Sequence, residues 1–589
     1  MTSTPAATPR ARLDDLVGGR SLQFGSFARE IRADRPEDVP AALAAAEQAA
    51  REGWWVVGLI AYEAAAGLEP HARTHPSQAG MPLAWWGLAE APDEDPAPLT
   101  SGEGFELAPW RPDWSRAEHA ERIDAVHAAI AEGDTYQANL TTRLRSRLTG
   151  DPYGLYGTLA HRQRGRHHAY LDLGDRVIVS ASPETFLTWD GTELATVPMK
   201  GTALRGSDPA ADRTAREALA AGDKDRAENI MIVDLLRNDL ARVAEPGSVE
   251  VTDLLAVEEY PTVFQLVSRI RARTRPGTTL TDVLGALFPC GSITGAPKLS
   301  TMALLAELED TPRGVYCGAI GVIEPGEVPR ARFSVAIRTV VVDPVTGAAE
   351  YGVGGGVTWQ STADGEYDEL LAKAAVLPTG TTEPFALLET FAVRDGEAVH
   401  LEEHLARLRG SAERFRIPVD AGAVEPALAQ VRVLAGEQMV RLRLRRDGAL
   451  TVEPRPLAPS AEPVRLVLDT VLTAFPEQLS THKTTMRGHF AAAKERHPSA
   501  DDVVLRGAHG RAVETTVATL CARIDGTWCT PPLADGCLDG VGRRLALARG
   551  ELVERPLEVE DVLAAEKLAV LSSSRGWRRA VLEPGAVSA

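Results

Sequence analysis

A break in the pattern at residues 377–384 does most to limit what this chain can fold into. The segment reads Leu-Pro-Thr-Gly-Thr-Thr-Glu-Pro, and a stretch with two prolines and a glycine continues neither a helix nor a strand. After it the chain starts anew, with a strand-like run, an Asp-Gly turn and a helical run. A chain of 589 residues is also too long for one hydrophobic core. We therefore expect two parts, residues 1–376 and 385–589, joined by a linker over 377–384.

Charge and cysteine content exclude several classes of protein. The net charge of −19 argues against nucleic acid or an anionic membrane as a partner. No apolar run is long enough to span a membrane, and the first residues lack the apolar core of a signal peptide. The five cysteines lack metal-site spacing and indicate reduced thiols, so we expect a cytoplasmic protein. Residues 1–20 show no clear pattern, and we expect them to be loosely attached.

Lysine is rare in this chain, with seven residues against 56 arginines. Arginine serves for surface charge, but it cannot easily lose a proton and act as a nucleophile or a Schiff-base amine. A retained lysine is therefore a better candidate for chemistry, although an ordinary solvated lysine remains the alternative. Lys200 follows a strand-like run and precedes a Gly-Thr turn. Glu184 lies sixteen residues earlier on what we predict to be the adjacent strand, so the two could act as an acid and a nucleophile.

Two acidic pairs are spaced for metal binding. Asp225 and Glu228 stand three residues apart on one helical run, and Glu366 and Glu369 do so on another. Two such faces converging on one cavity would suit Mg²⁺, which takes few carboxylates and leaves positions for substrate oxygens. Each pair alone is equally typical of a solvated helix face.

A glycine triplet and an arginine add features typical of anion binding. Residues 354–356 are three consecutive glycines at the end of a strand-like run, and they permit a close approach of the backbone to an anion. Arg338 lies within the strand-like run 335–342, and its guanidinium could pair with a carboxylate.

Taken in order, the polar segments before the linker resemble the chorismate-utilising enzymes over about residues 110–376. The resemblance rests on the segments 133–140, 182–184, 224–229, 234–240, 288–298, 316–321 and 354–373. It implies an α+β fold, with a chorismate-binding domain of large antiparallel β-sheets and outer helices. It also implies Mg²⁺ as a cofactor.

Position 200 separates the branches of that family. Anthranilate and salicylate synthases carry alanine there, whereas aminodeoxychorismate synthase component I carries lysine, and Gln137 stands where isochorismate-type enzymes have a lysine. The resemblance thus implies that Lys200 attacks C2 of chorismate, the C4 hydroxyl leaves, ammonia adds at C4 and the lysine departs. The resemblance also makes Glu184 the general acid. It makes Glu228 and Glu369 the ligands of Mg²⁺, with Asp225 and Glu366 beside them. The positions it implies as substrate contacts are Thr202, Tyr316, Arg338, Gly355 and Gln137. An amine near Mg²⁺ and arginine is expected to have a lowered pKa.

A second constellation follows the linker. Lys483 lies in Thr-His-Lys-Thr-Thr-Met-Arg, Glu514 follows a turn, and Val541 and Gly542 open a glycine-rich helix entry. With Arg407 on an earlier helical run, these residue types could supply what pyridoxal phosphate needs: a Schiff-base amine, a partner for the pyridine nitrogen and a phosphate clamp. Singly, each has an ordinary structural interpretation.

In this order the segments resemble the fold-type IV pyridoxal-phosphate enzymes over about residues 384–586, which implies an α/β domain. The resemblance makes Lys483 the Schiff-base and proton-transfer residue, Glu514 the partner of the pyridine nitrogen, and Arg407, Val541 and Gly542 the phosphate site. Three positions depart from the pattern: Thr519 and Ser572 replace asparagines, and Gly542 replaces a threonine.

The fusion of these parts predicts a bifunctional enzyme that makes aminodeoxychorismate from chorismate and then eliminates pyruvate to give 4-aminobenzoate. No Cys-His-Glu glutaminase segment is visible, so we expect ammonia from a separate glutamine amidotransferase subunit. By analogy with fold-type IV enzymes, we expect a homodimer through the second part. The alternatives are an aminotransferase or a non-catalytic docking module in the second part, and anthranilate synthase in the first.

Overall fold

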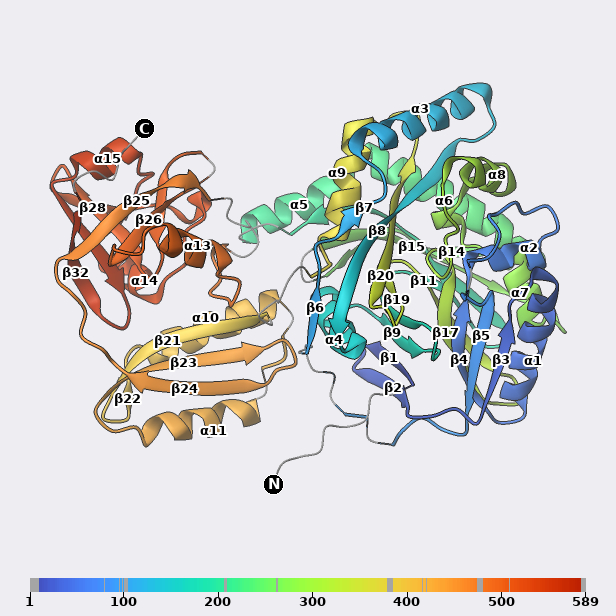
Figure 1. Ribbon diagram of the computed structural model, residues 1–589, viewed down its shortest axis with the longest axis horizontal. Helices are drawn as coiled ribbons and strands as arrows, with labels where there is room; N and C mark the ends of the chain where they lie inside the picture. Colours follow the sequence, from blue (N-terminus) through green and yellow to red (C-terminus); the bar gives the residue numbers. More distant parts are fainter. Residues whose placement is uncertain are drawn as a thin grey trace. The chain divides into compact units, whose positions relative to one another are not determined.

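The computed structural model describes residues 10–78, 80–94, 96–97, 99, 104–205, 209–260, 263–378, 385–415, 417–419, 421–473, 480–507 and 509–583. Most of the predicted linker, residues 379–384, lies outside these ranges. The chain divides into an N-terminal unit, Met1–Leu204 with Arg216–Thr382, and a C-terminal unit, Arg205–Ala215 with Glu383–Ala589 (Figure 1). In the described part of the chain, no helix is long and apolar enough to cross a membrane.

The N-terminal unit contains two ten-stranded antiparallel sheets. The first sheet runs in the order β16-β8-β20-β19-β10-β9-β1-β2, with β6 and β7 beside β8. Its strands are β1 (Ala11–Asp15), β2 (Arg20–Phe24), β6 (Phe105–Leu107), β7 (Arg111–Pro112), β8 (Gln137–Gly150), β9 (His167–Asp172), β10 (Val177–Ser182), β16 (Gly295–Ala296), β19 (Thr339–Val342) and β20 (Ala348–Val357).

The second sheet runs in the order β13-β15-β12-β11-β18-β17-β4-β5-β3, with β14 beside β15. Its strands are β3 (Arg29–Ala33), β4 (Trp55–Ile60), β5 (Ala84–Ala89), β11 (Thr185–Trp189), β12 (Glu193–Val197), β13 (Met199–Leu204), β14 (Glu250–Glu259), β15 (Val263–Arg273), β17 (Ala319–Glu324) and β18 (Arg330–Val335).

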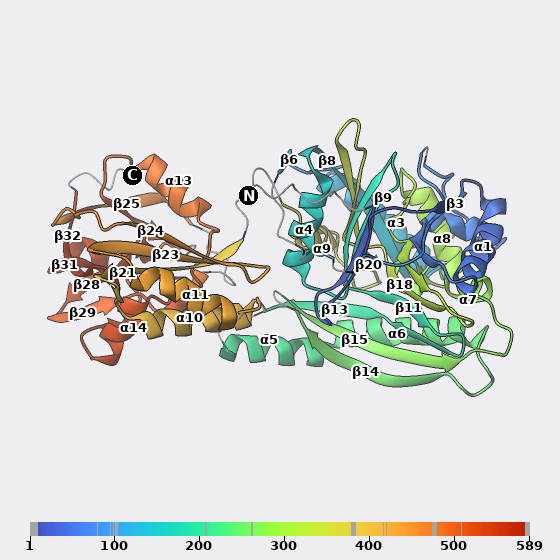
Figure 2. The same ribbon diagram turned by 90° about the horizontal axis from the view of Figure 1, so that it is seen from below.

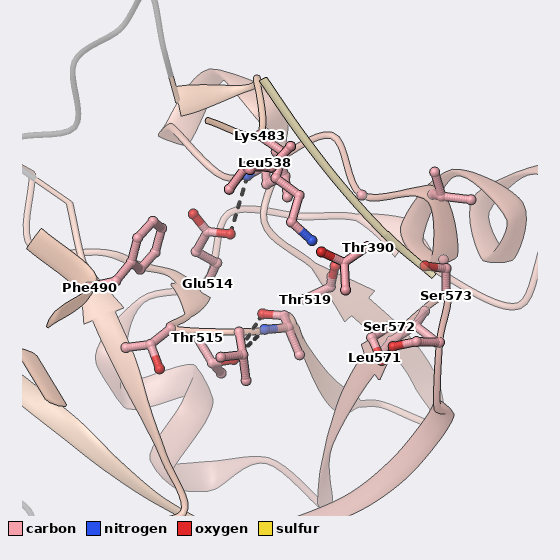
Figure 3. Close-up of a pocket in the computed structure, with 18 of the residues that line it drawn as sticks. Thr390, Lys483, Phe490, Glu514, Thr515, Thr519, Leu538, Leu571, Ser572 and Ser573 are labelled. Carbon is pink, nitrogen blue, oxygen red and sulfur yellow. Dashed lines mark hydrogen bonds between the residues drawn. The ribbon is translucent and has the colours of Figure 1, made fainter. Parts of the chain in front are cut away.

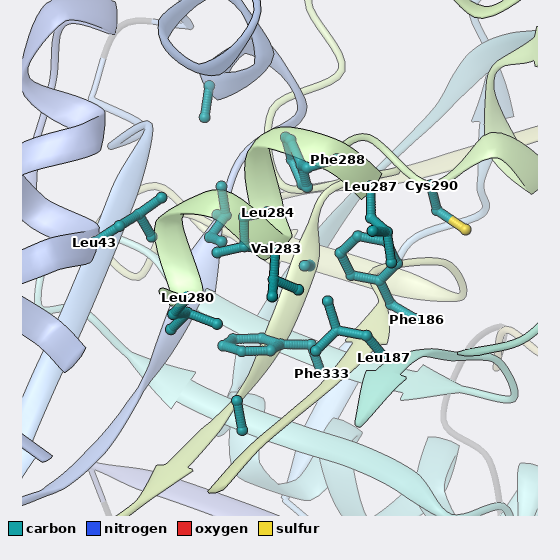
Figure 4. Close-up of a cluster of buried hydrophobic side chains, with 14 of the residues drawn as sticks. Leu43, Phe186, Leu187, Leu280, Val283, Leu284, Leu287, Phe288, Cys290 and Phe333 are labelled. Atoms are coloured by element: carbon teal, nitrogen blue, oxygen red, sulfur yellow. The ribbon is translucent and has the colours of Figure 1, made fainter. Parts of the chain in front are cut away.

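Helices cover the outer faces of the two sheets, and the sheets pack on each other. One apolar cluster joins the second sheet to α1, α6 and α7, where Leu280 and Leu284 meet Phe333 (Figure 4). Another cluster lies between the sheets, where the ring of Phe24 in the first sheet lies 6.3 Å from that of Trp55 in the second. The helices of this unit are α1 (Val39–Arg51), α2 (Ala65–Leu68), α3 (Arg116–Glu132), α4 (Pro152–Gln163), α6 (Asp223–Ala241), α7 (Leu280–Leu287), α8 (Lys298–Leu308) and α9 (Ala363–Ala374). Helix α5 (Pro209–Ala221) is divided between the two units, since Arg205–Ala215 belongs to the C-terminal one.

The chain crosses from one sheet to the other at two neighbouring places, which we call the seam. Strands β10 and β19 pair in the first sheet, and their continuations β11 and β18 pair in the second. The Val335 N–H donates to the Glu184 carbonyl at 3.1 Å, and the Ala181 N–H donates to the Arg338 carbonyl at 3.1 Å. The expectation of one strand-like run over 335–342 is therefore wrong. The chain turns between β18 and β19, and Arg338 takes a left-handed backbone with φ of 51° to make that turn.

Two further expectations have clear outcomes. The sequence predicts a helix over about residues 115–131 that ends at Gly133, and the structure confirms it: the helix begins at a capping box of Ser115 and Glu118, and Gly133 ends it with φ of 87°. The expectation that residues 1–20 are loosely attached is wrong for the described ones. Strands β1 and β2 form a hairpin in the first sheet, with the Arg12–Asp14 ion pair buried beneath it.

The C-terminal unit combines two smaller sheets. A four-stranded antiparallel sheet in the order β22-β21-β23-β24 carries α10 and α11 on one face (Figure 2). An eight-stranded mixed sheet runs β27-β26-β25-β32-β31-β28-β29-β30. The elements are β21 (Ala386–Arg394), β22 (Glu397–Ala398), α10 (Leu401–Arg414), α11 (Ala421–Arg432), β23 (Glu437–Arg445), β24 (Leu450–Pro456), β25 (Val464–Leu472), α13 (Gly488–Arg496), β26 (Asp502–Arg506), β27 (Ala512–Thr515), β28 (Thr519–Ile524), β29 (Thr527–Thr530), α14 (Val541–Ala548), β30 (Val553–Glu554), α15 (Val559–Ala564), β31 (Lys567–Ser572) and β32 (Gly576–Leu582).

Candidate active sites

Lys200 lies near the start of β13 and forms the centre of the first site. Its Nζ is 3.0 Å from Oε1 of Glu228 on α6, and both side chains are almost fully enclosed. The amide of Gln137, at the start of β8, donates to the same oxygen at 2.6 Å. Asp225 lies one helical turn before Glu228 and packs against Gly201. A Cβ on Gly201 would come within 2.9 Å of Asp225. Helix α6 thus brings its acidic face to Lys200.

The surroundings of Lys200 raise its pKa. Burial by itself lowers this pKa, but the ion pair with Glu228 and the charges of Glu184 and Glu369 outweigh burial. The sequence predicted a lowered pKa for Lys200 beside Mg²⁺ and arginine, but the protein's own side chains raise it. Contact with Glu228 and the charges of Glu184 and Glu369 therefore favour the protonated form of Lys200.

Glu184 lies at the seam, just before β11, and is 3% exposed. The Ser292 hydroxyl donates to its Oε1 at 2.6 Å. Burial raises the pKa of Glu184 to about 7, against the opposing effects of Ser292 and Lys200. Lys200 is not on the adjacent strand as predicted, because β12 and β15 separate β11 from β13. The acid and the amine are nevertheless within electrostatic reach of each other.

The glycine triplet at the end of β20 makes room for the two acidic helices. A Cβ on Gly355 would lie 2.9 Å from a carboxylate oxygen of Glu366, and one on Gly356 would lie 2.6 Å from Glu228. Glu369 is 2.7 Å from Nζ of Lys373, which also donates to the Gly354 carbonyl at 2.9 Å.

These carboxylates supply hard oxygen donors, the kind of ligand that Mg²⁺ prefers. In the described part of the chain, however, no three acidic, histidine or cysteine side chains are grouped closely enough to hold a metal ion by themselves. The ammonium groups of Lys200 and Lys373 are paired with Glu228 and Glu369, two of the four predicted ligands. The carboxylate oxygens are suitable ligands for Mg²⁺. Because they do not surround a metal position by themselves, a metal ion here would need substrate oxygens as further ligands.

The remaining predicted contact residues lie around this centre. Arg338 donates a hydrogen bond to Gln163 of α4, and burial lowers its pKa. The ring of Tyr316 packs on Gly352, where a Cβ would come within 2.1 Å of it, and the Arg143 guanidinium stacks 5.2 Å from the ring centroid. Thr202, in contrast, is exposed on β13. Arg338 and Tyr316 are thus fixed near the seam.

The second site is a cavity of about 550 Å³ in the C-terminal unit. It is lined by all five residues predicted to bind pyridoxal phosphate: Arg407, Lys483, Glu514, Val541 and Gly542. Lys483 points into the cavity near Thr390, and Glu514 lies on its wall (Figure 3). The Lys483 carbonyl accepts a hydrogen bond from the Leu388 N–H at 2.8 Å, which fixes the lysine to β21.

Burial shifts both titratable groups of this cavity. Burial, together with the positive charges of Arg407, Arg487 and Arg441, lowers the pKa of Lys483 to about 7, and Glu389 opposes this shift. Burial likewise raises the pKa of Glu514 to about 8, although the Leu538 N–H donates to its carboxylate at 3.3 Å. Lys483 therefore has a usable neutral fraction near pH 7.

Sequence reasoning missed the residue that holds Arg407. Glu389 on β21 accepts two hydrogen bonds from the Arg407 guanidinium, at 2.8 and 2.7 Å, and one from His404 at 2.5 Å. His404 in turn hydrogen-bonds Ser573 at 2.9 Å, so the network reaches the loop that closes the cavity. Glu389 was detectable as the one charged residue inside the apolar run 386–393.

The structure explains why glycine replaces the expected threonine at position 542. A Cβ there would lie 2.9 Å from the backbone of Ser572 and Ser573. The loop before β32 therefore packs directly against the first turn of α14, and Thr519 lines the same cavity.

The residues present fit pyridoxal phosphate. A buried amine faces the cavity, a buried carboxyl lies on its wall, and Arg407 is locked beside the N-terminus of α14, where its guanidinium donates to the Asp539 carbonyl at 2.9 Å. A helix N-terminus and an arginine together favour a phosphate.

Both units match known families. Residues 9–378 match the chorismate binding enzymes, and residues 386–582 match amino-transferase class IV. The chain therefore belongs to the chorismate binding enzyme family and carries a class IV aminotransferase fold in its C-terminal unit. The resemblance noted in the sequence is confirmed for both parts, and the α+β fold with it.

Particular relatives bear two different names. Aminodeoxychorismate synthase component 1 of Salmonella typhimurium is 40% identical over 289 residues, which cover 49% of this chain and 61% of that protein. An anthranilate synthase component 1 of Haloarcula marismortui is 40% identical over 304 residues, covering 51% and 60%. The crystal structure of anthranilate synthase component I from Streptococcus pneumoniae superimposes with a TM-score of 0.51 at 24% identity, covering 64% of this chain and 94% of that one. The chain spans about three fifths of these curated relatives, so their names alone do not choose between the two activities.

Proposed function

We propose that this chain makes 4-aminobenzoate from chorismate and ammonia in two steps, one in each unit. The N-terminal unit would form 4-amino-4-deoxychorismate, and the C-terminal unit would eliminate pyruvate from it. The observation that carries the proposal is the pair of enclosed lysines. Lys200 lies among carboxylates in a chorismate binding enzyme fold, and Lys483 lies in the cavity of a class IV fold.

In the first step Lys200 would be the nucleophile. It has to give up one proton before it attacks, because only the neutral amine is a nucleophile. The neutral amine would bond to C2 of chorismate, and the C4 hydroxyl would leave as water with a proton from Glu184. Ammonia would then bond to C4 as the bond from the lysine to C2 breaks, so the lysine is regenerated. The raised pKa of Glu184, about 7, supports its part as an acid at neutral pH.

Mg²⁺ would be held by Glu228 and Glu369, with Asp225 and Glu366 beside them. Bound there, it would supply positive charge for a substrate carboxylate. Arg338, which is buried and hydrogen-bonded to Gln163, supports binding of a second carboxylate. Gln137, Tyr316, Thr202 and Gly355 would complete the substrate contacts.

In the second step pyridoxal phosphate would supply an electron sink for the amino group of the substrate. Lys483 would take the proton from the substrate carbon, which its pKa of about 7 supports. Glu514 would face the pyridine nitrogen. Arg407 and the Val541 and Gly542 amides would hold the phosphate, and Glu389 would keep Arg407 in place.

We further propose a separate glutamine amidotransferase subunit as the source of ammonia, and a homodimer formed through the C-terminal unit. The name "component 1" carried by these relatives supports the existence of a second component. The test is to supply glutamine alone and then glutamine with a separate amidotransferase subunit: only the second should sustain product formation.

A product analysis tests the main proposal. The purified chain is incubated with chorismate, Mg²⁺ and ammonium, with and without pyridoxal phosphate, and the products are separated by mass. We expect 4-aminobenzoate and pyruvate with the cofactor, and aminodeoxychorismate without it. Anthranilate would overturn the role of Lys200. Accumulated aminodeoxychorismate in the presence of the cofactor would overturn the second step and favour a docking module, and amino transfer to 2-oxoglutarate would favour an aminotransferase.

A further inference from the structure

Ser292 is a buried residue that contacts Glu184 but belongs to a different part of the chain. It lies in the short helical turn Gly291–Ile293 and is 3% exposed. Its hydroxyl donates to Oε1 of Glu184 at 2.6 Å. The turn is anchored on α6, because a Cβ on Gly291 would lie 2.6 Å from Leu235. The turn that carries the hydroxyl therefore packs closely against α6.

A thiol completes a short chain of hydrogen bonds. Sγ of Cys290 lies 3.2 Å from Oγ of Ser292. Burial raises the pKa of the Cys290 thiol to about 12, so the thiol keeps its proton and can donate it to Ser292. The Ser292 hydroxyl is then free to donate to Glu184. The hydrogen bonds therefore run from the Cys290 thiol to Ser292, and from Ser292 to Glu184.

We propose that Ser292 is a positioning residue for the amination of chorismate: by donating to Oε1, it leaves Oε2 as the oxygen of Glu184 that carries the acidic proton. This inference rests on the proposed role of Glu184. A protonated carboxyl group has one O–H, and an oxygen that accepts a hydrogen bond from Ser292 is the poorer place for it. The main chain of Glu184 is fixed as well, since its N–H donates to Ser182 at 3.2 Å.

The charges around Glu184 determine what the hydroxyl does to its acidity. The groups that act on the carboxyl are the side chains of Lys200 and Lys373, the Cys290 thiol, the Ser292 hydroxyl and the Met199 N–H. Burial raises the pKa to about 7, while Ser292 and the two lysines oppose that rise. Loss of the hydroxyl would therefore raise the pKa further, and Glu184 would stay protonated to higher pH.

The experiment measures the protonation of Glu184 directly in the full-length chain. The infrared band of the protonated carboxyl group is followed against pH, with Glu184→Gln used to assign it. We expect Ser292→Ala to move the midpoint upward by about one pH unit, since a hydrogen bond to a carboxylate stabilises the charged form. Ser292→Thr, which keeps a hydroxyl, should restore the midpoint of the parent chain. Amination with ammonium should be slower in Ser292→Ala and recover in Ser292→Thr.

An unchanged midpoint in a folded Ser292→Ala chain would overturn the inference. So would a Ser292→Thr chain that behaves like the alanine variant while its melting temperature equals that of the parent. If Ser292→Ala does not fold, Cys290→Ala provides the second test, because it removes the donor behind Ser292 and should shift the midpoint in the same direction by less. The infrared midpoint does not depend on turnover, so a chain that fails to aminate chorismate would defeat the proposed function without deciding this test.

Discussion

The two enclosed lysines, Lys200 and Lys483, have opposite electrostatic surroundings. Lys200 is paired with Glu228 and lies near Glu184 and Glu369, and its pKa is raised. Lys483 lies near three arginines, and its pKa falls to about 7. Burial acts in the same direction on both amines, so the neighbouring charges decide the outcome. Near pH 7 the surroundings of Lys200 therefore favour its protonated form, whereas Lys483 has a neutral fraction.

The largest effect should come from removing each lysine in turn. Lys200→Ala should abolish formation of aminodeoxychorismate, and Lys483→Ala should abolish its conversion to 4-aminobenzoate, each by about a thousandfold or more. The measurement is product analysis with chorismate as substrate, and with aminodeoxychorismate supplied directly. Each variant should keep the reaction of the other unit. A Lys200→Ala chain with unchanged amination would rule out the covalent role.

The next effect concerns Glu389, which is buried with Arg407 and His404. Glu389→Ala leaves an arginine buried without its carboxylate, and we expect a loss of about 3–5 kcal/mol in the free energy of unfolding of the C-terminal unit. Denaturant titration measures this loss. The matched control is Glu402→Ala, at an exposed position of α10, the helix that carries His404 and Arg407; there we expect a loss of less than about 0.5 kcal/mol. Equal stabilities of the two variants would contradict the role of Glu389.

A smaller effect should follow from filling the space at Gly542. Gly542→Ala places a methyl group 2.9 Å from the backbone of Ser572 and Ser573, and such overpacking costs about 1–3 kcal/mol. We expect the dissociation constant of pyridoxal phosphate to rise by about tenfold. Gly488→Ala is the control, because a Cβ there meets nothing within 4 Å. The idea fails if both variants bind the cofactor equally well.

The smallest effect is a shift of a pH midpoint. The rate at which the cofactor-free chain captures pyridoxal phosphate should rise with pH around about 7, because only the neutral form of Lys483 reacts. Arg487→Met removes a positive charge that lowers the pKa of Lys483, so the midpoint should move upward by about half a unit. Stopped-flow absorbance measures the rate. A downward shift would show that Arg487 does not act through its charge.

Much of the candidate chemistry was readable from the sequence because it depends on residue type and order. The break at 377–384, the rarity of lysine and the ordered motifs identified Lys200, Glu228, Lys483 and Glu514 as candidates before any contact was known. Local signals also placed elements correctly, as Ser115 and Gly133 did for α3. These features act over a few residues, so the sequence alone determines them.

The tertiary structure decided what depends on contacts between distant segments. It placed the hairpin of β1 and β2 in the first sheet and broke the run 335–342 at the seam, because strand pairing overrides local pattern. It also joined Ser292 to Glu184 and Glu389 to Arg407 across 108 and 18 residues. The tertiary structure also determines the charge state of Lys200 and Lys483. The pKa of an amine depends on which groups approach it in space and on how much water they exclude.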